Sequence, residues 1–209
     1  MNPRLAILLD GGFVVKTLQD RNGHFPSAEE IVAETDQIKR AEALAGYDLF
    51  RIYYYDAPPP LSAEIVNPLD NSALNNPTYP QRLHLLQALE MAPNFAIRKG
   101  ETKFYGWNVR KNAVTKIKAN PNYVLKPRDL VPDIKQKGVD LKIGLDIALL
   151  SLRQFVQVIV VVTNDSDFVP AFKFARREGM RVFFDNLGQQ SRRSELKVHS
   201  DFVLPPRLP

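Results

Sequence analysis

The chain has 209 residues, 44% hydrophobic and 24% charged, so it can bury a sizeable core as one domain. It contains no cysteine, which excludes disulfides and thiolate metal sites and fits a reducing compartment. No apolar run approaches the ~20 residues that cross a bilayer, and the first run is too short for a signal peptide. We therefore expect a cytoplasmic protein with no membrane segment.

The first predicted strand is the apolar run at residues 5–9, and it ends on an acid, Asp10. Gly11 and Gly12 follow at once. Glycine lets the backbone approach a ligand closely or adopt dihedral angles that other residues avoid. This strand therefore delivers a carboxylate to the edge of a sheet, next to a backbone that a ligand can approach.

The next predicted elements are a helix and a second strand. A capping box at residues 27–30 predicts a helix that ends near Gly46. Residues 49–55 form the strand, which also ends on an acid, Asp56, before a run of prolines that stops it. A helix over residues 81–91 follows.

The middle of the chain is strongly basic. Residues 98–142 contain twelve Lys or Arg and four acids, interleaved with aromatic side chains. We expect a strand over residues 95–107, paired with residues near 114–117, and few helices between 108 and 136. Two interpretations stay open: a surface that meets phosphates and stacks bases, or a solvated loop with anchoring aromatics.

The clearest helix begins after residues 137–140. Its apolar residues recur at helical spacing and predict one stripe that faces the sheet. The stripe consists of Leu141, Leu145, Ala148 and Leu152. Asp140 lies off this stripe in the first turn, where the helix dipole favours a carboxylate, so a purely structural role is the alternative.

The most apolar strand is predicted at residues 158–162, which are all aliphatic and typical of a parallel strand buried on both faces. Asp165 and Asp167 follow in a polar turn before a helix that reaches residue 177. An acid in this position is often only a helix cap. A last strand at 181–184 leads to a basic, polar connection.

The alternating order of strands and helices predicts an α/β fold, a three-layer sandwich with a mostly parallel central sheet. We expect a single domain over residues 1–209, with a basic insertion at about 98–136 before the helix that carries Lys137 and Asp140. In such a sheet Asp10 and Asp165 leave the same edge, and Asp140 and Asp167 lie at helix N-termini that face it.

Carboxylates this close repel one another, and a bound divalent cation relieves the repulsion. Oxygen ligands select Mg²⁺ or Mn²⁺, whereas the three scattered histidines and the lack of cysteine make a zinc site unexpected. Carboxylate-held Mg²⁺ is typical of phosphodiester hydrolysis. The acids therefore predict a metal site that acts on a phosphodiester.

Four motifs, taken in order and spacing, resemble the NYN domain family, a branch of the PIN-like nucleases. They are Leu-Leu-Asp-Gly-Gly-Phe at 8–13, Lys-Gly-Val-Asp-Leu at 137–141, Thr-Asn-Asp-Ser-Asp-Phe at 163–168 and Ser-Asp-Phe at 200–202. The resemblance spans nearly the whole chain, with residues 57–135 similar in layout only. It implies a PIN-like fold, a Mg²⁺ or Mn²⁺ site and ribonuclease activity. The acidic residues of the family correspond to Asp10, Asp140, Asp165 and Asp167.

The leading hypothesis is thus a metal-dependent ribonuclease with RNA as its partner. The residues that we expect to bind substrate are Lys137, Lys142, Asn164, Ser166, Arg192 and Arg193. The alternative is an RNA-binding or regulatory adaptor that does not cleave. PIN-like proteins often pair, so the resemblance also implies a homodimer, with the apolar C-terminal residues as its candidate interface. Weaker site candidates are Asp56, Asp146 and Asp185.

Other hydrolase classes fit the sequence poorly. A haloacid dehalogenase-type phosphatase needs a second acid two residues after its nucleophile, where this chain has Gly12. A P-loop nucleotide hydrolase needs a Gly-rich loop with its Lys, and a Ser/His/Asp hydrolase needs a nucleophile elbow. The sequence contains neither motif.

Overall fold

The computed structural model describes residues 2–60, 65–189 and 194–206. Its centre is a six-stranded sheet in the order β3-β2-β1-β6-β7-β8, in which every neighbouring pair is parallel. The strands are β1 (Arg4–Asp10), β2 (Asp48–Asp56), β3 (Phe95–Lys99), β6 (Val158–Val162), β7 (Arg181–Asp185) and β8 (Phe202–Val203). The predicted α/β class with a mostly parallel sheet is confirmed.

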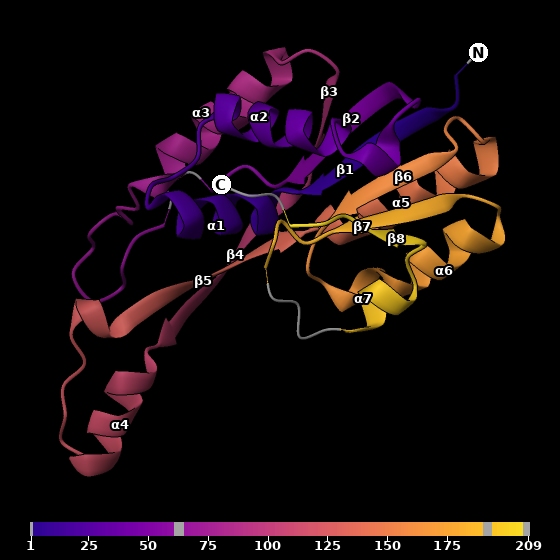
Figure 1. Cartoon of the computed structure of the whole chain (residues 1–209). Helices are drawn as coiled ribbons and strands as arrows, with labels where there is room; N and C mark the ends of the chain where they lie inside the picture. Colours follow the sequence, from indigo (N-terminus) through magenta and orange to yellow (C-terminus); the bar gives the residue numbers. More distant parts are fainter. Residues whose placement is uncertain (1, 61–64, 190–193, 207–209) are drawn as a thin grey trace.

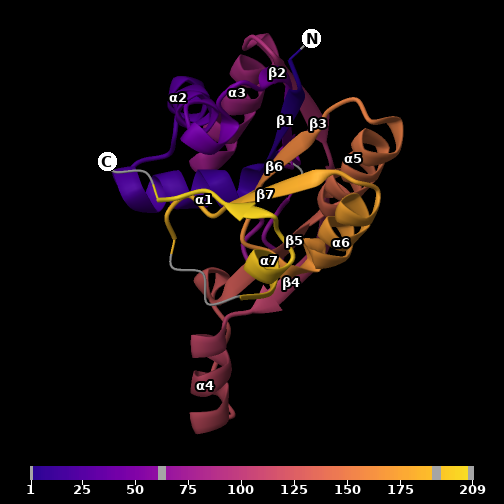
Figure 2. The ribbon, with the colours of Figure 1, turned by 45° about the vertical axis from the view of Figure 1, so that its right-hand side comes forward.

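Helices cover both faces of this sheet, which makes three layers (Figures 1 and 2). One face carries α1 (Gly11–Asn22), α2 (Ala28–Lys39) and α3 (Thr78–Met91). The other carries α5 (Val139–Arg153), α6 (Val169–Arg177) and α7 (Ser194–Val198). Short 3-10 turns lie at η1 (Glu42–Leu44), η3 (Pro127–Asp129) and η4 (Ser166–Phe168). No helix in the described ranges is long and apolar enough to cross a membrane.

The two central strands explain why the sheet is buried on both faces. In β1, Leu5, Ile7 and Leu9 pack in the core under α1 to α3, and Ala6 and Leu8 pack in the core under α5 to α7. Successive side chains of a strand point to opposite faces, so a continuous aliphatic run fills both cores. The same alternation holds for β6, which anchors the middle of the sheet.

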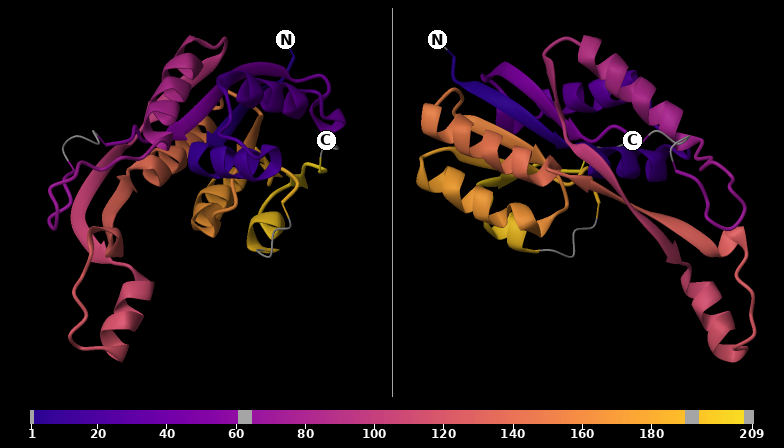
Figure 3. Two further views of the ribbon diagram at one scale, coloured as in Figure 1. Left: turned by 90° about the vertical axis from the view of Figure 1, so that its left-hand side faces the viewer. Right: turned by 180° about the vertical axis from the view of Figure 1, so that it is seen from behind.

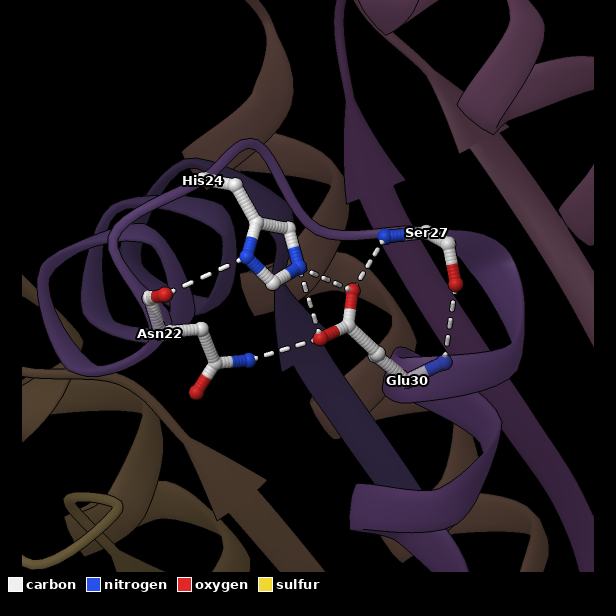
Figure 4. A network of polar contacts seen from close by, with 4 residues as sticks. All are labelled: Asn22, His24, Ser27 and Glu30. Carbon is white, nitrogen blue, oxygen red and sulfur yellow. Dashed lines mark hydrogen bonds and ion pairs between the residues drawn. The ribbon is translucent and has the colours of Figure 1, made fainter.

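A reciprocal cap fixes the start of α2, as its sequence predicts (Figure 4). The Ser27 N–H donates to a Glu30 carboxylate oxygen at 2.7 Å, and the Glu30 N–H donates to the Ser27 hydroxyl at 3.3 Å. Asn22 donates to the same carboxylate at 2.7 Å, and His24 lies 3.1 Å from it. His24 is therefore part of a helix cap, with its ring turned to Glu30.

The apolar C-terminal residues complete the sheet. Phe202 and Val203 form β8, which pairs with β7, and the Phe202 ring lies 5.2 Å from that of Phe183. Leu204 is buried in the core under α1 to α3. This segment already has an intramolecular role, and its expected place in a homodimer interface stays a prediction.

The basic middle of the chain forms an arm that projects from the body, and we call residues 101–137 the arm (Figures 1 and 3). It consists of β4 (Glu101–Val109) and β5 (Leu130–Lys137), which pair antiparallel, with α4 (Lys111–Ala119) and η3 at its far end. The predicted pairing of residues 95–107 with 114–117 is wrong. The segment divides at Gly100 between sheet and arm, and residues 114–117 lie in α4.

The predicted apolar stripe of α5 is also wrong in its direction. Ile143, Ile147 and Leu150 are the buried residues, whereas Leu141 and Leu145 are 66% and 59% exposed. A helix rich in Leu and Ile carries two stripes with the same spacing, and periodicity alone does not tell which one meets the sheet. The packing of α5 over β2 and β3 selects the Ile stripe.

Candidate functional site

Asp10 and Asp165 are partly buried, whereas Asp140 and Asp167 are exposed, and Asp10 is held most firmly by its surroundings. It ends β1 and caps α1, accepting a hydrogen bond from the Phe13 N–H at 3.3 Å. The Thr163 hydroxyl donates to its other carboxylate oxygen at 3.0 Å. Because Leu9 lies opposite Val162 in the parallel pair, Asp10 and Thr163 leave β1 and β6 side by side. The carboxylate is thus held from both strands.

Gly11 makes this geometry possible. A Cβ atom built on Gly11 lies 2.7 Å from Cζ of Tyr54 and 2.7 Å from the Tyr55 carbonyl oxygen, which is closer than side chains pack. Only glycine lets α1 start this close to β2. The tight turn keeps Asp10 at the sheet edge instead of letting the first turn of α1 move outward.

Thr163 also fixes the turn that carries the next two acids. Its hydroxyl accepts a hydrogen bond from the Asp165 N–H at 3.2 Å, and a carboxylate oxygen of Asp165 accepts one from the Asp167 N–H at 3.0 Å. Thr163 itself is fully buried. From the sequence alone Thr163 is only a turn residue; the signal that identifies it is the register, in which Thr163 follows Val162 as Asp10 follows the paired Leu9.

The electrostatics show that the acids lie near one another. The pKa of Asp10 is raised from 3.8 to about 6, mainly by burial and to a smaller extent by the charges of Asp140 and Asp165. The hydrogen bonds from Phe13 and Thr163 oppose this rise. Burial also raises the pKa of Asp140, together with the charges of Asp165 and Asp167. The structure therefore brings the four predicted acids into one patch of mutual repulsion.

The acids fit a weakly held hard cation better than a closed protein cage. Within the ranges that the structure describes, no group of three or more His, Asp or Glu side chains is placed to hold a metal ion. Mg²⁺, however, is commonly bound by one or two carboxylates, with water and substrate phosphates completing its shell. The candidate ligands are all oxygen atoms, and a cation would relieve the repulsion from Asp140 and Asp165 that helps to raise the pKa of Asp10.

The predicted substrate residues lie at different distances from this patch. Asn164 and Ser166 belong to the turn itself, and the buried Oδ1 of Asn164 has no hydrogen-bond partner in the described part of the chain. Lys142 is exposed on α5 two residues after Asp140, so the two side chains leave different faces of the helix, and Lys137 is exposed at the base of the arm. Arg192 and Arg193 lie outside the described residues.

Two of the weaker candidates have structural roles. Asp146 accepts hydrogen bonds from the Tyr55 hydroxyl at 2.9 Å and from Arg98 Nε at 2.9 Å, which ties α5 to β2 and β3. Asp185 ends β7 and accepts from the Leu187 N–H at 2.8 Å. Hydrogen-bonded carboxylates of this kind stabilise the ends of elements without reaching a ligand.

Asp56, the third weaker candidate, is completely buried at the end of β2. It accepts hydrogen bonds from Arg82 Nε at 2.9 Å and Arg82 Nη2 at 2.5 Å, and Gln136 donates to it at 2.9 Å. The ion pair with Arg82 balances its charge, and the amide of Gln136 joins it to the arm. Asp56 therefore connects parts of the fold.

Comparison with known proteins adds a family and a fold. A family model described as NYN domain matches residues 94–202, from β3 to β8. A crystal structure of a protein of unknown function from Vibrio parahaemolyticus superposes with a TM-score of 0.51 at 16% sequence identity, covering 97% of this chain and 92% of that one. This likeness shows a shared fold alone. No curated protein matches the chain.

Proposed function

The chain belongs to the NYN domain family, whose members are generally nucleases, and on this premise we propose that it is a metal-dependent ribonuclease. The observation that carries the proposal is the buried carboxylate of Asp10, which sits at the carboxyl edge of the parallel sheet with a pKa raised to about 6. Ligands of open α/β sheets bind at this edge. Strongly perturbed carboxylates cluster at functional sites.

Asp10, Asp140, Asp165 and Asp167 are the residues that would hold Mg²⁺ or Mn²⁺. When bound, such an ion polarises the phosphodiester and lowers the pKa of water. Thr163 and the Phe13 N–H hold the Asp10 carboxylate at a fixed orientation, which reduces the cost of placing it against substrate.

The remaining predicted contacts act on the RNA. Lys142 is exposed two residues after Asp140, where its ammonium group neutralises a substrate phosphate. The Oδ1 of Asn164 is unpartnered but shielded from solvent, so it would accept from an ordered water inside the turn, and contact with RNA needs the turn to open.

The test is cleavage of a mixed panel of labelled RNAs and single-stranded DNA with Mn²⁺, Mg²⁺ or EDTA. We expect metal-dependent cleavage of RNA, reduced at least ~100-fold by Asp10→Asn because the variant loses a charged ligand. Asp20→Asn is the matched control, since Asp20 is an exposed residue of the same helix. Equal activity of wild type and Asp10→Asn, or no activity in any metal, contradicts the proposal.

The basic charge of the arm, nine Lys or Arg and three acids in residues 101–137, favours a second candidate function, an RNA-binding adaptor that does not cleave. An adaptor binds RNA with a steep dependence on salt and shows no turnover in any metal. Binding without cleavage in the panel above selects this function.

A further inference from the structure

The arm carries a charge and a position that suit a nucleic-acid strand. Its residues 101–137 contain nine Lys or Arg and three acids. The charge continues to the far end, where Lys111, Lys116 and Lys118 lie exposed on α4. The arm begins directly after β3 and ends directly before α5, so it leaves the body at the same edge of the sheet as the acidic patch (Figures 1 and 3).

Hydrogen bonds hold the base of the arm against the end of β2. Gln136 of the arm donates to the buried carboxylate of Asp56 at 2.9 Å. The Thr102 hydroxyl donates to the Pro58 carbonyl oxygen at 2.6 Å, and the Gly100 N–H donates to the Asp56 carbonyl oxygen at 2.8 Å. Both strands of the arm are thus tied to the end of β2 and the residues just after it, β5 through Asp56 and β4 through Pro58, which gives the base of the arm a defined orientation.

One aromatic ring on the arm is placed for stacking. Tyr105 is 54% exposed, yet its ring lies 5.4 Å from Nζ of Lys135 and 5.6 Å from Nζ of Lys137. Residues 135 and 137 share one face of β5, three to five positions before Asp140. An open ring beside two ammonium groups matches the repeating unit of a single strand, a base next to a phosphate.

We propose that Tyr105, Lys135 and Lys137 form a binding platform for single-stranded RNA. A base stacks on the Tyr105 ring while the two lysines contact the neighbouring phosphates, and the strand continues toward Asp140. A duplex leaves the ring without a partner, since its bases are stacked on one another. That the ligand is RNA rests on the proposed function. That it is single-stranded rests on the exposed Tyr105 ring and the two lysines of the arm.

The test is fluorescence anisotropy in EDTA with single-stranded RNA of about 20 nucleotides and a duplex of the same length, the span of one or two binding sites. We expect Tyr105→Leu to weaken single-strand binding about tenfold and to change duplex binding less than about twofold. The double variant Lys135→Gln/Lys137→Gln lowers the slope of log affinity against log salt by about 1–2.

The matched control is Arg51→Gln/Arg153→Gln, which removes the same charge from exposed residues near the opposite edge of the sheet and leaves affinity unchanged. Equal loss of single-strand and duplex binding in Tyr105→Leu overturns the platform. A second result also overturns the platform: the double Lys variant binds RNA as well as wild type does but no longer binds phosphatidylserine vesicles. The arm would then be assigned to a membrane surface.

This test separates the two proposals, because binding in EDTA needs no cleavage. Selective loss in Tyr105→Leu with no metal-dependent cleavage by the wild type keeps the platform and removes the ribonuclease. Cleavage with unchanged binding by Tyr105→Leu keeps the ribonuclease and removes the platform. Tyr105 is exposed and lies outside both cores, so the variant is expected to fold, which a thermal melt checks.

Discussion

At the scale of single residues, Asp10 shows a conflict between stability and function. Its carboxyl group is buried and lies near two other acids, so its pKa rises to about 6, above the 3.8 of an ordinary Asp. The folded protein therefore holds this proton to a higher pH than the unfolded chain does. The contribution of Asp10 to stability is largest below pH 3.8 and is lost as pH rises to about 6.

This conflict predicts that Asp10→Asn stabilises the protein at neutral pH. The amide oxygen still accepts from the Phe13 N–H, but the amide NH2 can only donate to the Thr163 hydroxyl, so that bond changes direction. Because Asn carries no charge, we expect a gain of up to about 3 kcal/mol in the free energy of unfolding at pH 7. The gain disappears near pH 4, where the wild-type carboxyl is protonated. Urea unfolding of both proteins at the two pH values measures it. A variant that is less stable than wild type at pH 7 contradicts a raised pKa.

The positions of the site acids follow from the sequence because parallel strands share one carboxyl edge. Asp10 and Asp165 follow aliphatic runs, and the structure places them near Asp140. Thr163 did not follow, because a Thr after a strand has no chemical signature of its own. Its role depends on the register that sets Leu9 opposite Val162, which only the paired strands reveal.

At the scale of elements, α5 has two apolar stripes with similar spacing, one of Ile and one of Leu, and only the Ile stripe packs on the sheet. Ile147 is fully buried, whereas Leu145 is 59% exposed. We expect Ile147→Ala to lower the free energy of unfolding by about 3 kcal/mol, since it leaves a cavity. Leu145→Ala removes a side chain of the same size and is expected to cost less than about 0.5 kcal/mol. Urea unfolding of the two variants measures both losses. A larger loss for Leu145→Ala than for Ile147→Ala would show that the predicted Leu stripe faces the sheet.

The sequence predicted well those elements whose residue pattern is compatible with only one local structure. An all-aliphatic run such as β6 fits a strand buried on both faces, and the box at Ser27 and Glu30 marks one helix start. The arm was predicted poorly because no side-chain cap marks the start of α4, and this helix buries only Ala113, so packing gives it little support. Its strands pair across more than twenty residues, a contact that local patterns do not encode.

At the scale of the whole molecule, the body and the arm are separable in their packing. The body has two apolar cores, one on each face of the sheet. Of residues 101–137, all of which the structure describes, none belongs to either core. Stability thus resides in the body, while the net positive charge lies on the arm, which has nine Lys or Arg and three acids against 19 and 20 in the rest of the chain.

This division predicts that the arm can be shortened without unfolding the body. Thr102 and Gln136 face each other across the two strands, so residues 103–135 can be replaced by an Asn-Gly turn. Both residues keep their bonds to Pro58 and Asp56. We expect cooperative thermal unfolding within about 5 °C of wild type, because neither core is touched. Metal-dependent cleavage of short RNA continues, while affinity for long single strands falls by at least about tenfold.

The two readouts of this variant separate the roles of body and arm. Lost cooperativity would show that the arm contributes to the fold and that its charge is incidental to a structural role. Retained folding with lost cleavage of short RNA would place part of the chemistry on the arm, and the same deletion combined with Asp10→Asn gives the background rate. If the body carries the chemistry and the arm only binds RNA, the variant folds, still cleaves short RNA and binds long RNA more weakly. We expect this result because all four acids lie in the body, outside residues 101–137.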